Sequence, residues 1–373
     1  MISCLREPVP SGCLEAVAHR LRLEQWIGSD HRTFWYATGR CALFQALRVL
    51  SFNAGASVLM PAYVPAGVID PVRALGHEVR FYETGRDLLI APQSIQDQLK
   101  LDRSIRAMVV IHPMGRPQPI AALRAVCQEH NVLIIEDCAQ ALFCRDEAGK
   151  PLGQGGDISL FSLTKTVGVP EGAAAVIVNA ALATPAIATV REWSTRMAIL
   201  WYRAHLRCNL AFHRTSKLST AMRLQAMSGH CYDRYYRTIS RDFRPLRLSR
   251  RSARLLRRLR CDEVIQRRRE NVSFLYRTVR TSSLEWVFPH DAPGWVPMAL
   301  PALVTRGARE TFVRRALEDG VLLPSLCDRW DFLPNDVGFH HEREYLARHL
   351  LVPVNEHIGP EQIAHVAEVL NRL

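Results

Sequence analysis

Short apolar runs alternate with helical patterns through the first two-thirds of the 373-residue chain. The apolar runs predict six strands, at residues 57–60, 79–82, 108–111, 132–135, 158–161 and 175–178. Helices are expected before and between them, at residues 41–50, 68–75 and 120–129. This order is typical of an α/β fold, in which helices cover both faces of a mainly parallel central sheet. Ligand-binding residues of such a sheet collect just beyond the carboxyl ends of its strands.

The rest of the chain predicts a second, smaller unit. Residues 191–240 are arginine-rich and aromatic, and we interpret them as an irregular helical insertion. Beyond them come a basic helix, strand-like residues 295–300 and 321–323, and a terminal helix at residues 360–373. We therefore expect a large α/β domain over residues 25–245. A small α+β domain is expected over residues 246–373, joined by the N-terminal segment 1–24.

The cysteines and the apolar stretches exclude several classes of protein. The ten cysteines form no CxxC pair and no Cys/His cluster at zinc-finger spacing, so we expect no metal site. The beginning, MISCLREPVPSG, lacks the apolar core of a secretory signal, so a reducing cytoplasm without disulfides is expected. The longest uncharged stretch, residues 172–190, is rich in alanine and interrupted by Asn179, Thr184 and Pro185. It predicts a buried strand, a turn and a helix, and no transmembrane segment.

The chain is basic, with 48 Lys and Arg against 36 Asp and Glu, a formal net charge of +12. Eleven arginines but only two carboxylates lie between Arg244 and Arg269, where apolar residues recur at helical spacing. This pattern predicts an amphipathic helix with a basic outer face. That face is either simply solvated or a docking surface for phosphates or for an anionic membrane, as a peripheral contact. No nucleic-acid fold signature accompanies it, so no nucleic-acid partner is expected.

Three residues that carry chemistry stand at the ends of predicted elements. Asp137 and Lys165 each follow a strand, and Gly39 lies at the amino end of the first helix. A partly desolvated lysine can form a Schiff base, and an aspartate can hold a ring nitrogen protonated. A helix N-terminus with a glycine suits a phosphate, because its backbone N–H groups are free. Together these are the requirements of pyridoxal 5′-phosphate.

Each of these residues, taken alone, is also compatible with a plainer role. Asp137 could be a turn former or a helix cap, and a lysine beside Gly168 and Pro170 could simply be solvated. Ser162 and Lys165 match the SxxK of acyl-serine enzymes, but the SDN and KTG partners of that site are absent. The chain has four lysines, at positions 100, 150, 165 and 217. With so few lysines, a lysine is less expected to stand by chance at the strand end where this chemistry requires one. The joint pattern therefore favours a pyridoxal-phosphate site.

The segments that carry these residues resemble a known family. They are similar to motifs of the DegT/StrS family of pyridoxal-phosphate sugar aminotransferases: ATGRCALFQAL (37–47), IEDCAQAL (135–142), GGDISLFSLTKTVGVPEGAAAVIV (155–178) and LLVPVNEHIGPEQIAHVAEVLNRL (350–373). The resemblance runs from about Ala37 to Leu373 and is weakest at residues 191–240. It implies the architecture of a fold-type-I PLP-dependent transferase, pyridoxal 5′-phosphate as cofactor, and a homodimer.

The resemblance also implies roles for individual residues. Lys165 would carry the cofactor covalently and move a proton at the substrate carbon, and Asp137 would keep the ring nitrogen protonated. Gln140 would contact the side of the ring that carries the hydroxyl. The phosphate would be held by Gly39, Arg40 and Ser162.

Departures from the family pattern suggest further candidates. The family's ring-stacking aromatic aligns with Pro65, so Tyr63 would take its place or stacking would be weak. The asparagine motif by which a second subunit completes the phosphate site is not visible in residues 242–249, where Arg244 or Arg247 would supply the charge. His112, in the HxxG turn, would either contact substrate at the edge of the cleft or hold the turn. A shorter serine-to-lysine spacing and Ala173 in place of a glycine also depart from the family.

The implied function is a cytoplasmic transaminase that moves an amino group, from glutamate, onto a nucleotide-linked keto-sugar in polysaccharide or glycoconjugate biosynthesis. The arginines suit a diphosphate, because guanidinium groups bind phosphate oxygens in pairs. Two alternatives remain open. One is a PLP-dependent sugar dehydratase or another elimination enzyme, although dehydratase relatives replace the lysine with histidine. The other is a degenerate, non-catalytic paralogue that acts as a scaffold.

Overall fold

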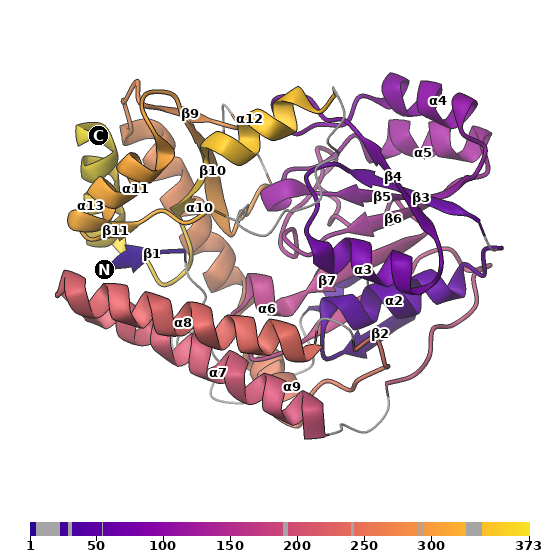
Figure 1. Ribbon diagram of the computed structural model, residues 1–373, viewed down its shortest axis with the longest axis horizontal. Helices are drawn as coiled ribbons and strands as arrows, with labels where there is room; N and C mark the ends of the chain where they lie inside the picture. The colour runs from indigo at the N-terminus through magenta and orange to yellow at the C-terminus, as the bar shows by residue number, and fades with distance from the viewer. Residues whose placement is uncertain are drawn as a thin grey trace.

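A seven-stranded sheet forms the centre of the larger part of the molecule (Figure 1). Its strands follow the order β2-β8-β7-β6-β5-β3-β4; β8 runs antiparallel to β2 and β7, and the other neighbours pair in parallel. The strands are β2 (Arg32–Tyr36), β3 (Ser57–Pro61), β4 (Glu78–Tyr82), β5 (Ile105–Ile111), β6 (Leu133–Asp137), β7 (Ile158–Ser162) and β8 (Ala173–Ile177). The computed structural model describes residues 1–4, 23–28, 32–53, 55–188, 193–239, 242–288, 291–292, 294–325 and 338–373. The mainly parallel sheet and all six predicted strands are confirmed, although β5 begins three residues earlier than predicted.

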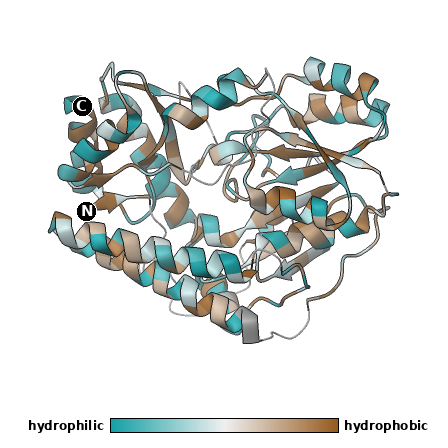
Figure 2. Cartoon of the chain, viewed as in Figure 1, coloured by the Kyte–Doolittle hydropathy of each residue, from teal (hydrophilic) through white to brown (hydrophobic). Residues whose placement is uncertain are grey.

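Helices cover both faces of this sheet, α2 and α3 on one side and α4 and α5 on the other (Figure 1). In β5, Val109 packs into the core under α2 and α3, whereas Met108 and Val110 pack into the core under α4 and α5. Because the inner strands are buried on both faces, they are hydrophobic along their length, as Figure 2 shows. The four helices are α2 (Gly39–Val49), α3 (Ala66–Ala74), α4 (Pro92–Leu101) and α5 (Ile120–Glu129).

Parts of this layer differ from the prediction. The half-buried edge strand β2 and the mostly polar helix α4 lack a long apolar run, so the sequence pattern does not reveal them. The helix expected after β8 is absent from residues 181–188, while residues 189–192 lie outside the described part. Side chains of β2 use the carbonyls of this segment instead. Arg32 donates to the Leu182 carbonyl at 2.7 Å and Tyr36 to the Ala186 carbonyl at 2.8 Å.

The C-terminal part contains a second, antiparallel sheet in the order β12-β10-β9. A strand is predicted at residues 295–300, but β10 begins only at Ala299, because Trp295 lies in a turn and its indole N–H donates to the Met114 carbonyl at 2.9 Å. β1 (Ile2–Ser3) pairs in parallel with β11 (Val321–Leu322), so residues 2 and 3 lie beside this part. The domain boundaries at residues 25, 245 and 246 stay a prediction. The other elements here are β9 (Leu284–Trp286), β10 (Ala299–Val304), β12 (His349–Pro353), α11 (Arg309–Glu318), α12 (His340–Arg348) and α13 (Pro360–Arg372).

A long helical hairpin runs along the lower edge of the molecule in Figure 1. The insertion predicted as irregular contains two regular 22-residue helices, α7 (Trp193–Arg214) and α8 (Leu218–Ile239), which pack along each other at the lower edge of Figure 1. The basic helix is divided into α9 (Arg250–Arg258) and α10 (Cys261–Thr278), because Leu259 takes an extended conformation. Among the described helices, none combines the length and apolar character that crossing a membrane requires.

Candidate active site

Two adjoining cavities open where the carboxyl ends of β6 and β7 meet the amino end of α2. The first cavity has a volume of about 170 Å³ and the second of about 350 Å³. Parallel strands end at the same edge of a sheet, so this edge is where ligand-binding residues of an α/β fold are expected. The cavities share seven lining residues, which are Pro65, Val68, Asp137, Ala139, Lys165, Tyr232 and Tyr236.

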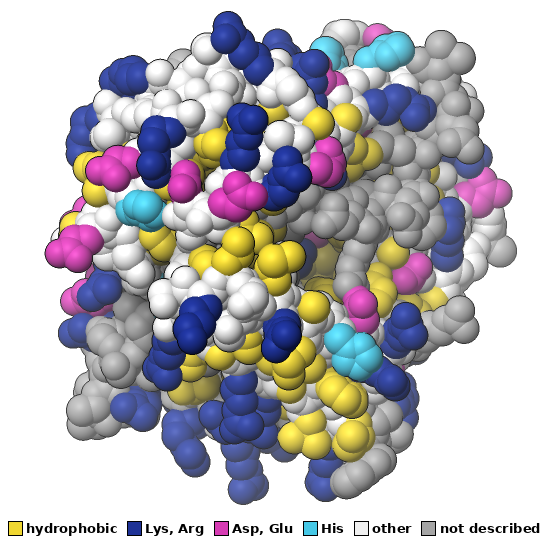
Figure 3. All heavy atoms as spheres, turned by 60° about the vertical axis from the view of Figure 1, so that its left-hand side comes forward, with side chains coloured by type: hydrophobic (Ala, Val, Ile, Leu, Met, Phe, Trp, Pro, Cys, Tyr) yellow, Lys and Arg dark blue, Asp and Glu magenta, His cyan; other side chains and the backbone are white. Residues whose placement is uncertain are grey.

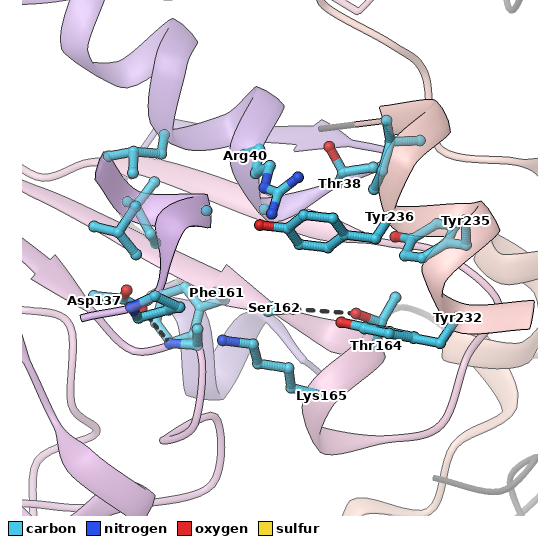
Figure 4. A pocket seen from close by; sticks show the side chains of 18 residues that line it. Thr38, Arg40, Asp137, Phe161, Ser162, Thr164, Lys165, Tyr232, Tyr235 and Tyr236 are labelled. Carbon is cyan, nitrogen blue, oxygen red and sulfur yellow. Dashed lines mark hydrogen bonds between the residues drawn. The ribbon is translucent and has the colours of Figure 1, made fainter. Parts of the chain in front are cut away.

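The predicted lysine and aspartate lie in these cavities. Asp137 is the last residue of β6, and Lys165 lies in α6 (Leu163–Thr166), the single turn that follows β7. Since β6 and β7 are parallel neighbours, their ends bring the two side chains together. Asp137 is buried, and its Oδ1 accepts a hydrogen bond from the Ala139 N–H at 2.8 Å. Figure 4 shows the Lys165 amine directed into the pocket toward the side on which Asp137 lies.

The amino end of α2 closes the far end of the first cavity. Thr38 caps the helix by accepting the Cys41 N–H through its side-chain oxygen at 3.3 Å, and Gly39 and Arg40 line the cavity. One guanidinium nitrogen of Arg40, Nη1, is buried and has no hydrogen-bond partner among the described residues. Buried polar atoms are almost always hydrogen-bonded. A helix N-terminus and an unpartnered guanidinium nitrogen together favour an anion at this end.

Neighbouring residues hold the Arg40 side chain in place. Its guanidinium carbon lies 3.9 Å from the centroid of the Tyr236 ring, which is a cation–π contact. Gly67, in the first turn of α3, leaves room for the guanidinium, since a Cβ there would lie 2.8 Å from Nε of Arg40. Ser162 completes this end of the cavity, with its Oγ 3.2 Å from Oγ1 of Thr164. The predicted phosphate-binding residues Gly39, Arg40 and Ser162 are thus brought together.

Three tyrosines of α8 also line the first cavity, and none of the sequence motifs assigns them to the site. Figure 4 shows Tyr232, Tyr235 and Tyr236 beside Arg40 and Thr164. They stand at positions i, i+3 and i+4, which share one face of a helix. This spacing is visible in the sequence CYDRYY. What the spacing does not reveal is that this face of the hairpin meets the end of the sheet.

Tyr63 and Gln140 line the second cavity. Burial raises the pKa of Tyr63, and the nearby charges of Glu342 and Asp137 raise it further, so its hydroxyl stays protonated. Gln140 accepts the Met114 N–H through Oε1 at 2.8 Å. Both residues lie near the predicted lysine and aspartate. The stacking role expected for Tyr63 stays a prediction.

His112 is fully buried and lines neither cavity, which does not match the expected substrate contact. Its Nδ1 accepts the Gln118 N–H at 3.1 Å, which assigns the proton to Nε2, and Nε2 donates to Glu136 at 3.1 Å. Burial by itself would raise the pKa of Glu136, but the hydrogen bonds from His112 and from glycine N–H groups outweigh it and lower the pKa. The His112 N–H also donates to the Asp137 carbonyl at 3.2 Å. These contacts match the structural one of the two roles considered, in which His112 holds the turn beside Asp137.

Arg244 lines neither of the two cavities of its own chain. Its guanidinium pairs with Asp242, Nε to Oδ1 at 2.9 Å and Nη2 to Oδ2 at 2.8 Å, and faces an open hollow outside the two cavities. The Cys41 thiol donates to the Arg244 carbonyl at 2.7 Å, which fixes this segment along the side of α2. Within one chain, the cation at the amino end of α2 in the first cavity is Arg40. The expectation that Arg244 or Arg247 supplies the charge where a second subunit completes the phosphate site stays a prediction.

Comparisons with known proteins agree with this geometry. The sequence profile of the DegT/DnrJ/EryC1/StrS aminotransferase family matches residues 21–371. The chain is 30 % identical over 139 residues to GDP-perosamine synthase of Vibrio cholerae, covering 36 % of this chain and 37 % of that protein. It is 31 % identical over 152 residues to an L-glutamine:2-deoxy-scyllo-inosose aminotransferase of Streptoalloteichus tenebrarius, covering 39 % of this chain and 35 % of that protein. The matches thus span little more than a third of the length of these curated relatives.

A solved structure shows the same fold over the whole length. The sugar aminotransferase CalS13 from Micromonospora echinospora covers 100 % of both chains, with a TM-score of 0.68 and 20 % sequence identity. The expected fold class is confirmed, because this likeness includes the sheet, the helices on its two faces and the C-terminal part.

Proposed function

The chain belongs to the DegT/DnrJ/EryC1/StrS aminotransferase family, and from this premise we propose that it transfers an amino group to a keto-sugar with pyridoxal 5′-phosphate as its cofactor. The observation that carries the proposal is the first cavity itself. Lys165 and Asp137 line it together, and at its far end lie the amino end of α2 and the buried, unpartnered Nη1 of Arg40.

The residues present fit the family's cofactor. Pyridoxal phosphate, when bound, supplies an electron-withdrawing ring that stabilises negative charge at a substrate carbon. Gly39, Arg40 and Ser162 hold the phosphate in this proposal, which gives Nη1 of Arg40 the acceptor that it lacks. Asp137, an acceptor when ionised, holds the proton on the ring nitrogen. Gln140 lines the second cavity together with Asp137 and Lys165, and it would contact the ring hydroxyl from that side.

In this proposal Lys165 moves the proton that transamination requires. Its amine lines both cavities, so it can reach the first cavity, proposed for the cofactor, and the second, proposed for the substrate. It takes a proton from the reacting carbon of the donor and returns one to the carbon that receives the amino group. The tyrosines of α8 and the buried Tyr63 line the surrounding walls and limit the access of water.

The second cavity supports a sugar-sized substrate. Its volume of about 350 Å³ lies within the usual range for small-molecule sites, and it adjoins Lys165. Its walls are mostly apolar, with Gln140 and Ser325 among the polar groups. We propose a nucleotide-linked keto-sugar as acceptor and glutamate as donor, in polysaccharide or glycoconjugate biosynthesis in the cytoplasm. Curated relatives include enzymes named for GDP-perosamine and for scyllo-inosose, so a linked sugar and a free cyclitol are the two cases to compare. A homodimer is part of the same proposal.

Absorbance spectroscopy followed by product analysis tests the function. The purified protein with added cofactor should show a band near the visible edge that shifts when glutamate is added. Lys165→Ala should abolish both the shift and the amino-sugar product. Lys217→Ala, which removes an exposed lysine between α7 and α8, should leave both unchanged.

A panel of keto-sugars, nucleotide-linked and free, with glutamate or glutamine as donor identifies the substrates. A product that forms without any amino donor would indicate elimination. A protein that stays colourless with cofactor, or a Lys165→Ala variant that still transaminates, would refute the proposal.

A further inference from the structure

A third cavity, separate from the proposed active site, lies between α7, α9 and the segment that follows α6. Its volume of about 240 Å³ is roughly eight times the share of one water molecule in the liquid. Three of its lining residues are arginines, and most of the others are apolar. The lining, which we call the arginine pocket, consists of Gly168, Pro170, Leu200, Arg203, Ala204, Leu206, Arg207, Arg251 and Leu255.

The arginines of this pocket converge from two helices. Arg203 and Arg207 stand at positions i and i+4 of α7 and therefore share one face, while Arg251 comes from the first turn of α9. Figure 3 shows Lys and Arg side chains gathered along the lower edge of the molecule, at the height of α7 and α9 in Figure 1, with hydrophobic side chains beside them. The positive charge is thus collected around a cavity and not only spread along one solvated helix face.

Among the residues that the structure describes, no carboxylate forms an ion pair with these three arginines. Nε of Arg203 is buried without a hydrogen-bond partner, and the described residues provide no hydrogen bond or ion pair to Arg207 or Arg251. Burial lowers the pKa of Arg203, and the charges of Arg251 and Arg207 lower it further. Like charges held together in this way cost free energy until an anion neutralises them.

We propose that the arginine pocket binds the phosphate group of an anionic ligand. Guanidinium groups donate pairs of hydrogen bonds to phosphate oxygens, and three converging arginines match the charge of a phosphate or a diphosphate. The carbon part of the ligand packs against Leu200, which is 52 % exposed, and against Leu255. Binding at this site does not require the proposed transamination.

The pocket touches the segment that carries Lys165. Gly168 and Pro170 in its wall follow α6, and the hydroxyl of Tyr202, the neighbour of Arg203, donates to the Thr164 carbonyl at 3.3 Å. Occupancy of the pocket is therefore expected to perturb the surroundings of Lys165 and to be visible in the spectrum of the loaded protein.

Titration calorimetry with pyrophosphate and with orthophosphate tests this proposal. The protein is first saturated with pyridoxal phosphate, so that its own phosphate site is filled. Arg207→Gln and Arg251→Gln should each weaken binding about tenfold or more, because each removes a hydrogen bond between charged groups. Arg254→Gln and Arg257→Gln are the matched controls: they make the same change of charge on α9 at exposed positions outside the pocket, and should change the affinity less than about twofold.

A second arm separates soluble phosphates from lipid headgroups. Sedimentation with phosphatidylcholine vesicles, with and without phosphatidylglycerol, is measured for the same variants. Binding of pyrophosphate that depends on Arg207 and Arg251 supports a soluble ligand, and binding to anionic vesicles with the same dependence supports a lipid phosphate. The proposal is overturned if neither probe binds. It is also overturned if the control variants weaken binding as much as the pocket variants, or if a partner carboxylate fills the pocket in the assembled protein.

Discussion

Replacing Arg268 by methionine tests how much stability comes from a buried ion pair that contacts the turn carrying Lys165. Nε and Nη2 of Arg268 donate to Oε2 of Glu356 at 2.8 and 2.6 Å, and Nη2 also donates to the Thr166 carbonyl in α6. The side chains of Arg268 and Glu356 are only 3 % and 4 % exposed. The pair therefore ties α10 and the segment after β12 to the turn that contains Lys165.

The size of the effect follows from this burial. Arg268→Met leaves the Glu356 carboxylate buried without its cation, and breaking a buried pair in this way costs about 3–5 kcal/mol. Since proteins are typically stable by about 5–15 kcal/mol, this is a large share of the free energy of unfolding. The double variant Arg268→Met with Glu356→Leu should regain most of the loss, because replacing both charges by apolar groups is often close to neutral.

The stability lost in Arg268→Met should depend on pH, and the direction of this dependence follows from the pKa of Glu356. Burial by itself would raise the pKa of Glu356, but the charge of Arg268 is the largest of the effects that lower it below its ordinary value of 4.5. In the unaltered chain the stabilisation by this pair is therefore present above that value and is lost as pH falls through the lowered pKa. Without Arg268, burial raises the pKa of Glu356 above its ordinary value. The loss in the variant should then be largest at neutral pH and shrink in mild acid, where Glu356 takes up a proton.

Urea unfolding followed by tryptophan fluorescence, at neutral and mildly acidic pH, measures these differences. Arg269→Met, an exposed neighbour in α10, is the matched control and should change the free energy of unfolding by less than about 0.5 kcal/mol. A loss below about 1 kcal/mol for Arg268→Met would contradict this reasoning, which rests on the cost of an unpaired buried charge. So would a loss that is equal at both pH values, or a double variant as unstable as the single one.

Three further predictions concern the cavities. Gly67→Ala should weaken cofactor binding, measured by absorbance titration, because its Cβ would lie 2.8 Å from Nε of Arg40 and displace the guanidinium; unchanged affinity would mean that the guanidinium does not need this position to hold the phosphate. Tyr236→Leu should weaken the same binding about twofold to thirtyfold by removing the cation–π contact, whereas Tyr236→Phe, which keeps the ring over Arg40, should have the smaller effect. His112→Ala should lower the free energy of unfolding by about 1–3 kcal/mol, because Glu136 loses a buried hydrogen bond. If the variant kept full stability and showed a raised KM for the sugar, the result would support the other role, in which His112 contacts the substrate.

The fold class and the pair Asp137 and Lys165 could be predicted from the sequence, because the patterns that indicate them involve residues close together along the chain. The apolar runs predicted the sheet, and the rule that parallel strands end at one edge was enough to bring Asp137 and Lys165 together. The edge strand β2 was not predicted, because a half-buried strand has no continuous apolar run. The helix expected after β8 was wrong because Arg32 and Tyr36, far away in the sequence, use the carbonyls of that segment.

By itself the sequence determined the α/β alternation, the lysine and aspartate at strand ends and the glycine that opens α2, all of which follow from periodicity and from residue chemistry. Only the tertiary structure decided which long-range neighbours those residues meet. It placed the tyrosines of α8 in the cavity, buried His112 against Glu136, paired Arg244 with Asp242 and gathered three arginines around another cavity. The physical reason is that burial, charge compensation and helix-to-sheet contact depend on distances in space, which residue spacing along a chain does not contain.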